Sequence, residues 1–417
     1  MYLPANIISR PVVRALMLMM LSLVAASNAF ALPSFARQTG ESCDSCHIGS
    51  FGPQLTPHGM KFKIGGYTES DGKPGHVPLA AMLIETYTHT RADQDPDVDG
   101  SPTAGFSKNN NTVMQELSLF LAGKWFENVG SFAQATFSGV DKKTSLDNVD
   151  IRYASDKLLG ENGTFGVSLN NNPGFQDPFN TLPGFRFPYV SSDFGPAPGA
   201  GVLLDDGVSG QVFGATAYAQ MANGLYAEFG GYHALSEGFL KKVKLDPTAE
   251  VRGFAPYWRL AYFKDRKSEA FSVGLVGMSA KAGDYAHTFS AEKFSDVGID
   301  AHYQLLGNRM NIWSINGAYI HENGPVDVNQ LNVAGSYYFD KTYGATVRYF
   351  SVSVPDASSN GWTLQADWTP FGKESSWQAP WANLRLGLQY TMYNKLDGDS
   401  SNASDANTMM AFAWLSL

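Results

Sequence analysis

The stretch that decides the fold is Asn383-Leu384-Arg385-Leu386-Gly387-Leu388-Gln389-Tyr390-Thr391. Its leucines and its tyrosine fall on every second position, while most of the positions between them are polar. Because successive side chains of a β-strand point to opposite faces, this stretch predicts a strand with one apolar face and one polar face. The same alternation is found in residues 343–349 and 362–368.

Segments of this kind recur from Val77 to the end of the chain. Many run for about 10 residues and have aromatic side chains near their ends, as a lipid-facing band with aromatic girdles requires. A water-soluble β-sandwich also alternates, but the length and the aromatic ends favour an all-β fold, a transmembrane antiparallel β-barrel of about 16 strands. We expect the strands at residues 78–90, 113–124, 131–140, 148–155, 163–170, 208–221, 224–234, 254–263, 270–281, 295–305, 310–321, 331–339, 343–354, 361–370, 382–394 and 408–417.

The composition agrees with a β-rich membrane protein. The 417 residues include 42 glycines, 13% are aromatic and only 17% are charged, which is typical of an all-β chain with many turns. The formal net charge of −9 argues against a nucleic-acid partner.

The first 31 residues predict an export signal. Arg10 and Arg14 lie in a positive segment that precedes an apolar run over residues 15–26, and Ala29-Phe30-Ala31 provides a cleavage site. The run is too short to span a bilayer as a helix, and no later stretch reaches the roughly 18 apolar residues that such a helix needs. We therefore expect an exported protein that crosses the outer membrane with strands.

The most specific motif is Cys43-Asp44-Ser45-Cys46-His47, which contains the only two cysteines of the chain. Cys-x-x-Cys-His is the attachment sequence of c-type haem: two thioether bonds hold the porphyrin, and the histidine becomes the proximal iron ligand. A redox-active disulfide is disfavoured because no thioredoxin-like βαβ pattern surrounds the motif. A structural zinc site would need two further ligands. We predict one covalent haem c on Cys43 and Cys46, with His47 as its proximal ligand.

The sixth iron ligand is left open by the sequence. His58 and Met60 follow shortly after the motif and are the two candidates, and His76 and Met82 lie further along. Methionine opposite histidine raises the haem potential, and an open sixth position is also compatible with the motif.

Three regions follow from these features: the signal at 1–31, a monohaem cytochrome c domain at 32–76, and a porin-like barrel at 77–417. The middle region is too short for a core of its own, so we expect it to fold against or inside the barrel as a plug. Residues 171–207 contain six prolines and several aromatic side chains. Since aromatic residues are rare in disordered segments, we expect this loop to fold into the barrel mouth and not to extend freely outside it.

The N-terminal region resembles a known family. The matching residues are Pro33-Ser34-Phe35-Ala36-Arg37-Gln38-Thr39-Gly40, Cys43 to His47, Leu55-Thr56-Pro57, Gly59, Phe62-Lys63 and Gly65-Gly66-Tyr67. They resemble the fused cytochrome–porins, the outer-membrane monohaem iron oxidases of Fe(II)-oxidising bacteria. The chain departs from that pattern at His58-Gly59-Met60, where the family commonly has Phe-Gly-Arg.

The resemblance implies an outer-membrane electron-transfer protein that oxidises extracellular Fe(II) at the haem and passes electrons to a periplasmic c-type cytochrome. Its activity would be that of an iron(II):cytochrome c oxidoreductase, with outer-membrane lipid as its other partner. Two alternatives stay open: an electron conduit for a different extracellular donor, and a diffusion porin whose haem plug is structural or sensory.

Overall fold

The computed structural model describes residues 32–94, 105–160, 163–288 and 290–417, and the predicted export signal lies outside them. The strands are β1 Leu79–Thr90, β2 Asn111–Phe126, β3 Val129–Ser138, β4 Lys143–Ser155, β5 Thr164–Asn170, β6 Val212–Gln220, β7 Leu225–Ala234, β8 Glu250–Val251, β9 Ala255–Asp265, β10 Glu269–Gly283, β11 Glu292–Leu305, β12 Asn311–Asn323, β13 Val328–Phe339, β14 Tyr343–Ser353, β15 Ser359–Trp368, β16 Asn383–Lys395 and β17 Thr408–Ser416.

The helices are short. They are α2 Pro33–Thr39, α3 Cys43–Cys46, η1 Ile48–Ser50, α4 Pro57–Ile64, η2 Pro183–Phe185, η3 Leu203–Gly207, α5 Glu237–Lys242 and η4 Ala403–Ala406. Within the described ranges, no helix has both the length and the apolar character needed to cross a membrane.

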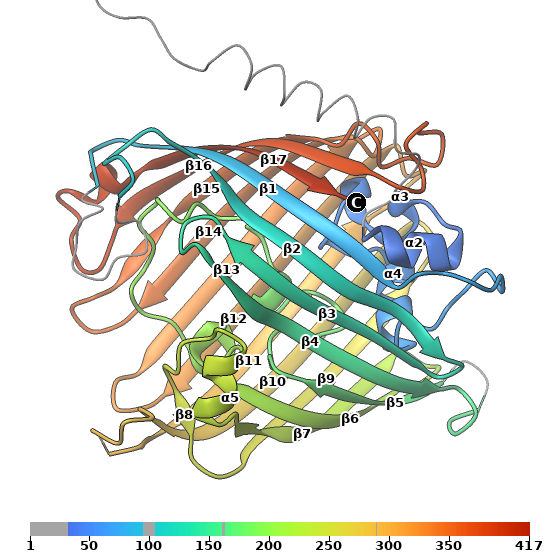
Figure 1. Cartoon of the computed structure of the whole chain (residues 1–417), viewed down its shortest axis with the longest axis horizontal. Helices are drawn as coiled ribbons and strands as arrows, with labels where there is room; N and C mark the ends of the chain where they lie inside the picture. Colours follow the sequence, from blue (N-terminus) through green and yellow to red (C-terminus); the bar gives the residue numbers. More distant parts are fainter. Residues whose placement is uncertain (1–31, 95–104, 161–162, 289) are drawn as a thin grey trace, which may run out of the picture.

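Sixteen of the strands close into one antiparallel barrel (Figure 1). Each strand pairs with its neighbours along the chain, β7 pairs with β9, and β1 pairs with β17 to close the ring. The two-residue strand β8 only extends the pairing of β10 at one end. Each predicted segment overlaps one of the sixteen strands, so the predicted barrel is confirmed. Closure leaves no unpaired strand edge, which a barrel in lipid requires.

The wall of the barrel has its apolar side chains on the outside. In β11, Val297 and Ile299 are about half exposed, whereas Asp296, Asp300 and His302 on the alternate positions are buried in the lumen. The outward Phe339, Tyr343 and Trp368, at the ends of β13, β14 and β15, are likewise exposed. An apolar exterior with aromatic side chains at the strand ends is the arrangement of a membrane-embedded barrel.

The two ends of the barrel differ. At one end the connections are short, such as residues 127–128 between β2 and β3; we call it the turn end. At the other end they are mostly long, such as residues 91–110 and 235–254; we call it the loop end. The helices α2, α3 and α4 lie at the turn end, close to the C-terminus (Figure 1). Residues 139–142, 324–327 and 354–358 at the loop end are exceptions, because these connections are short.

One connection at the turn end, residues 369–382, is longer than the others, and its contacts explain why. The guanidinium of Arg37 lies 4.9 Å from the centre of the Trp381 ring, and Ala379 packs against Ala36 and Cys43. A Cβ added to Gly372 would lie 2.2 Å from the Cβ of Ser50, so only glycine fits at this contact. Residues 369–382 therefore cover the N-terminal helices from the outside.

Residues 171–211 enter the lumen. Phe175 and Phe179 are almost fully buried there, and Asp177 accepts hydrogen bonds from the backbone N–H groups of Phe179, Thr181 and Leu182. We call residues 171–211 the lumen loop. The prediction that this segment folds into the barrel is confirmed, and the segment reaches as far as the N-terminal helices.

Candidate haem site

The N-terminal helices place the two cysteines and the histidine on one short turn. α3 is a single turn, so Cys43 and Cys46, three residues apart, share one face, and the backbone N–H of His47 donates to the Cys43 carbonyl at 2.8 Å. Cys43 is only 3% exposed. The backbone then leaves the helix at His47 in an extended conformation.

The His47 ring is held by a backbone carbonyl. Its Nδ1 lies 3.3 Å from the Gln54 oxygen, and because a carbonyl can only accept, Nδ1 carries the proton. Burial lowers the pKa of His47 to about 4, so the ring is neutral at pH 7. A neutral imidazole whose Nδ1–H is donated to a carbonyl presents Nε2 as a metal ligand, as iron-ligating histidines do.

The start of α4 fixes the other side of the motif. Thr56 caps this helix, accepting from the Gly59 N–H at 3.3 Å, and its own hydroxyl donates to the Ser45 carbonyl. A Cβ at position 59 would lie 2.3 Å from the Cys46 oxygen, so Gly59 allows α4 to approach α3 this closely. Pro57, at the first position of the helix, supplies a suitable φ.

Cys43, Cys46 and His47 all face one cavity of about 350 Å³, which lies between the N-terminal helices, the wall and the lumen loop. This volume is in the range of ligand pockets. Its lining is largely aromatic and aliphatic, with Phe35 and Phe62 from the helices, Phe185 from the lumen loop, and Met82, Phe120 and Trp414 from the wall. We call it the haem cavity.

The contents of this cavity fit a c-type haem. Two cysteine sulfurs at the attachment spacing and the His47 ring face it, and its apolar lining would cover a porphyrin plate. A redox-active dithiol fits less well, because burial raises the pKa of Cys46 to about 12, whereas reactive thiols need a lowered pKa. These residues are therefore the ones that would hold the group.

The two candidates for the sixth ligand do not face the haem cavity. Met60 is 1% exposed and packs with Leu55, Ile64 and Phe179 in a separate apolar cluster. The Nε2 atom of His58 lies 3.0 Å from a Glu41 carboxylate oxygen, at the surface of the helices. The placement favours neither residue as an iron ligand. His76 is paired with Asp71, away from the cavity.

Met82, which the sequence placed further along the chain, does line the haem cavity. It lies on β1 opposite Ser416, and Ser416 in turn lies opposite Asn383, whose amide contacts the Cys43 sulfur at 3.4 Å. Adjacent strands are about 4.8 Å apart, so Met82 is about 10 Å along the wall from the point where Cys43 touches it. No local pattern in the sequence could have shown this proximity, because it depends on the closure of the barrel.

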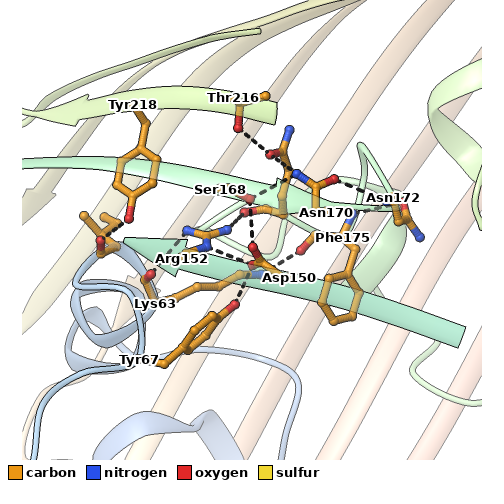
Figure 2. Close-up of polar contacts among 12 residues, drawn as sticks. Lys63, Tyr67, Asp150, Arg152, Ser168, Asn170, Asn172, Phe175, Thr216 and Tyr218 are labelled. Atoms are coloured by element: carbon orange, nitrogen blue, oxygen red, sulfur yellow. Dashed lines mark hydrogen bonds and ion pairs between the residues drawn. The ribbon is translucent and has the colours of Figure 1, made fainter. Parts of the chain in front are cut away.

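The N-terminal helices are fixed to the wall by buried polar groups (Figure 2). The Tyr67 hydroxyl donates to Asp150 at 2.7 Å, and Asp150 also accepts from Arg152 at 2.8 Å. Arg152 in turn donates to the Lys63 carbonyl, and the Lys63 ammonium donates to the Phe175 carbonyl at 2.7 Å. This network, which we call the anchor network, joins helix α4, strand β4 and the lumen loop.

A second set of contacts holds the opposite side. Arg385 of β16 donates to the Gly52 carbonyl at 3.1 Å and to the Tyr338 hydroxyl at 3.0 Å, and it forms an ion pair with Asp367. Gln304 of β11 donates to the Leu55 carbonyl at 2.7 Å. The N-terminal helices are therefore attached around most of the barrel circumference, as a plug would be.

The lumen is closed to water over much of its length. Six charged lumen-facing side chains, from β4, β7, β9, β11 and β16, are at most 1% exposed: Asp150, Arg152, Glu228, Arg259, Asp300 and Arg385. The N-terminal helices lie at the turn end, and the lumen loop lies between them and the loop end.

Comparison with known proteins adds little beyond the fold. No protein-family model matches the chain, and no curated protein matches its sequence. Similar solved structures include the anion-selective porin from Comamonas acidovorans (12% identity over 81% of this chain and 98% of that chain, TM-score 0.49). Others are OmpF of Salmonella typhi in complex with daunomycin (12%, 81% and 97%, TM-score 0.48) and an OmpT variant of Vibrio cholerae lacking loop L8 (11%, 81% and 98%, TM-score 0.46). These values carry no information on ligand or activity, and the resemblance to cytochrome–porins stays a prediction.

Proposed function

We propose that the chain is an outer-membrane electron-transfer protein with one covalent haem c. In this proposal Cys43 and Cys46 bind the haem, His47 ligates the iron, and the haem accepts one electron at a time from an extracellular donor. Fe(II) is the donor that the resemblance implies, and a periplasmic c-type cytochrome is the acceptor. The observation that carries the proposal is the haem cavity, because it brings the complete attachment motif against an apolar wall.

The exterior of the barrel supports the membrane location. Outward side chains such as Leu364 and Val347 are more than 40% exposed, whereas their lumen-facing neighbours are buried. In water this surface would be a large apolar patch, and in a bilayer it faces lipid. Together with the predicted export signal, it supports the outer membrane as the site of action.

Several residues in and around the haem cavity have a defined task in this proposal. The backbone carbonyl of Gln54 would orient His47, and the aromatic lining would exclude water. The hydrogen bonds of Lys63 to Asn180 and of Tyr67 to Asp150 would keep these two side chains from ligating the iron. Haem iron is commonly ligated by histidine, methionine, cysteine or tyrosine. Among the described residues lining the cavity outside the attachment motif, only Met82 offers such a group without a polar partner, so Met82 is the residue that would complete the iron ligation.

The sealed lumen separates this proposal from the diffusion porin. Electron transfer through a packed interior needs no open water path, whereas solute diffusion does. We therefore expect very low single-channel conductance from the purified protein in planar bilayers. A stable conductance of the size seen for open porins would instead support the porin alternative. If the protein lost its haem on denaturation, the haem would be bound without covalent bonds.

The test of the proposal is stopped-flow reduction of the purified, haem-loaded full chain with Fe(II) and with a panel of other donors. We expect a haem that stays attached in a denaturing gel, shows a low-spin c-type spectrum and is reduced by Fe(II). Absence of covalent haem would overturn the proposal. If the haem is not reduced by Fe(II) but is reduced by another donor, the protein would still be an electron conduit, with that donor in place of Fe(II).

A further inference from the structure

A second cavity, which the proposed function does not use, lies in the loop-end half of the lumen. It has a volume of about 500 Å³ and is bounded by residues 183–201 of the lumen loop and by strands β13, β14, β16 and β17. We call it the outer cavity. Its lining is polar where the haem cavity is apolar, and it includes Arg186, Asp205, Gln330, Arg348 and Tyr393.

The charges of the described residues that line the outer cavity do not balance. Arg186 is paired with Asp205, and Gln330 also donates to Asp205. Arg348 projects from β14 into the same cavity, and among the described side chains no carboxylate lies within ion-pairing distance of it. The Nε atom of Arg348 is buried without a hydrogen-bond partner. The Cζ atom of its guanidinium lies 4.7 Å from the centre of the Phe350 ring, in a cation–π contact.

A half-buried guanidinium whose Nε is buried without a hydrogen-bond partner needs an explanation, since such a group costs free energy until an anion or water satisfies it. Guanidinium matches carboxylate and phosphate oxygens with two parallel hydrogen bonds. The volume of the cavity is sufficient for a small polyatomic anion. We infer that the outer cavity binds a small oxyanion, a carboxylate or a phosphate, and that Arg348 supplies the charge that holds it.

The lumen loop separates this site from the haem cavity by a single layer of chain. Gly184, Phe185 and Tyr189 line the haem cavity, while Arg186 and Pro188, between them in the sequence, line the outer cavity. An anion bound at Arg348 therefore lies next to the wall of the haem cavity. This arrangement gives the anion site a role: it holds the electron donor as an anionic carboxylate complex of Fe(II).

That role rests on the proposed function, whereas anion binding does not. In the transfer step the iron of the bound complex goes from Fe(II) to Fe(III), and the single electron goes to the oxidised haem. No bond forms or breaks and no proton moves. In a citrate complex of Fe(II), a carboxylate of the citrate would bind the Arg348 guanidinium.

The first experiment measures anion binding to the purified full chain in detergent by titration calorimetry, with citrate and inorganic phosphate as separate probes. We expect at least one probe to bind, and Arg348→Gln to weaken it roughly ten- to a hundredfold, since a hydrogen bond to a charged group commonly has this effect. Arg266→Gln is the matched control, because this arginine is mostly exposed at the turn end and pairs with Glu269. The two probes show whether the site prefers carboxylate or phosphate.

No binding of either probe to the wild type would overturn the inference, and so would equal binding to Arg348→Gln. If Arg348→Gln fails to fold, Arg348→Lys keeps a cation but loses the paired donors, and the wild-type titration still decides. Folding of each variant is checked by its heat-modifiable mobility in gels.

The second experiment tests the role of the site by stopped-flow reduction of the haem. We expect Arg348→Gln to slow reduction by Fe(II)–citrate about tenfold and to leave reduction by uncomplexed Fe(II) unchanged. If Arg348→Gln changes the rate of haem reduction by the same factor with both donors, the site does not hold the donor. The inference that it binds an anion would then stand without that role. A chain without haem would refute the proposed function, and calorimetry would still report on the anion site.

Discussion

The two cavities of the lumen differ in chemistry although one barrel encloses both. The haem cavity at the turn end is walled by aromatic and aliphatic side chains from α2, α4, β1, β2 and β17. The outer cavity at the loop end is walled by arginine, amide and hydroxyl groups from β13, β14 and β16. A porphyrin needs apolar cover, whereas a hydrated donor needs polar contacts. The division therefore supports an electron acceptor near one compartment and a donor site near the other.

The largest effect separating the two cavities should come from removing the thiols. The double variant Cys43→Ser, Cys46→Ser cannot form thioether bonds, so we expect complete loss of covalent haem, measured by haem staining of a denaturing gel. Citrate binding at the outer cavity should persist. Ser45→Ala, between the two cysteines, is the control and should retain the haem. Covalent haem in the double variant would show that the attachment site lies elsewhere.

The anchor network should give the next largest effect. Asp150→Ala removes the partner of the buried Arg152 and of the Tyr67 hydroxyl, and we expect a loss of about 3–5 kcal/mol in the free energy of unfolding. The plug should also loosen, which conductance in planar bilayers would report. Asp265→Ala breaks the partly exposed pair with Lys61 and should cost less than about 1 kcal/mol. Equal effects of the two substitutions would mean that the network does not hold the plug.

A smaller effect is expected at the contact between α4 and the attachment motif. In Gly59→Ala the new Cβ would meet the Cys46 carbonyl, so the helix has to shift, at a cost of about 1–3 kcal/mol. Haem incorporation per barrel, measured from the absorbance of the purified protein, should fall. Gly238→Ala in α5 has open space around its Cβ and is the control. Unchanged incorporation in Gly59→Ala would show that the helix tolerates the displacement.

The smallest structural effect is expected at Met82. Met82→Leu nearly conserves volume and should cost less than about 1.5 kcal/mol in stability. The haem potential should nevertheless fall by roughly 100 mV, because axial ligands set potentials over about 0.8 V and methionine raises them. Potentiometric titration measures the change, and the outward-facing Met409→Leu is the control. An unchanged potential and spectrum would show that Met82 does not ligate the iron, and the proposal that the protein binds haem would be unaffected.

The barrel could be predicted from the sequence because its signal is local. Period-two alternation, as in Leu384, Leu386 and Leu388, is set by backbone geometry within each strand, so all sixteen strands were found. The attachment motif is local as well, and the structure brings Cys43, Cys46 and His47 to one cavity.

The rest of the site could not be predicted, because it depends on which distant strands meet. Met82 and Trp414 are far apart in the sequence but lie on paired strands β1 and β17 only after the ring closes. His58 and Met60 were favoured by their nearness in sequence, yet neither lines the haem cavity: Met60 packs in a separate apolar cluster, and His58 pairs with Glu41, within 4.8 Å of the Cys46 sulfur. Arg348 alternates like any lumen-facing residue, and only the absence of a described ionic partner distinguishes it.

The cover formed by residues 369–382 has a consequence for biogenesis. Cys43 lies behind it, in contact with Ala379 and Asn383, and almost none of its surface is accessible once the barrel has closed. An attachment enzyme could not reach the Cys43 sulfur through the finished wall. On the proposed function, maturation therefore has to precede insertion: the cofactor is joined to an unfolded precursor in the periplasm, and the strands then assemble around it.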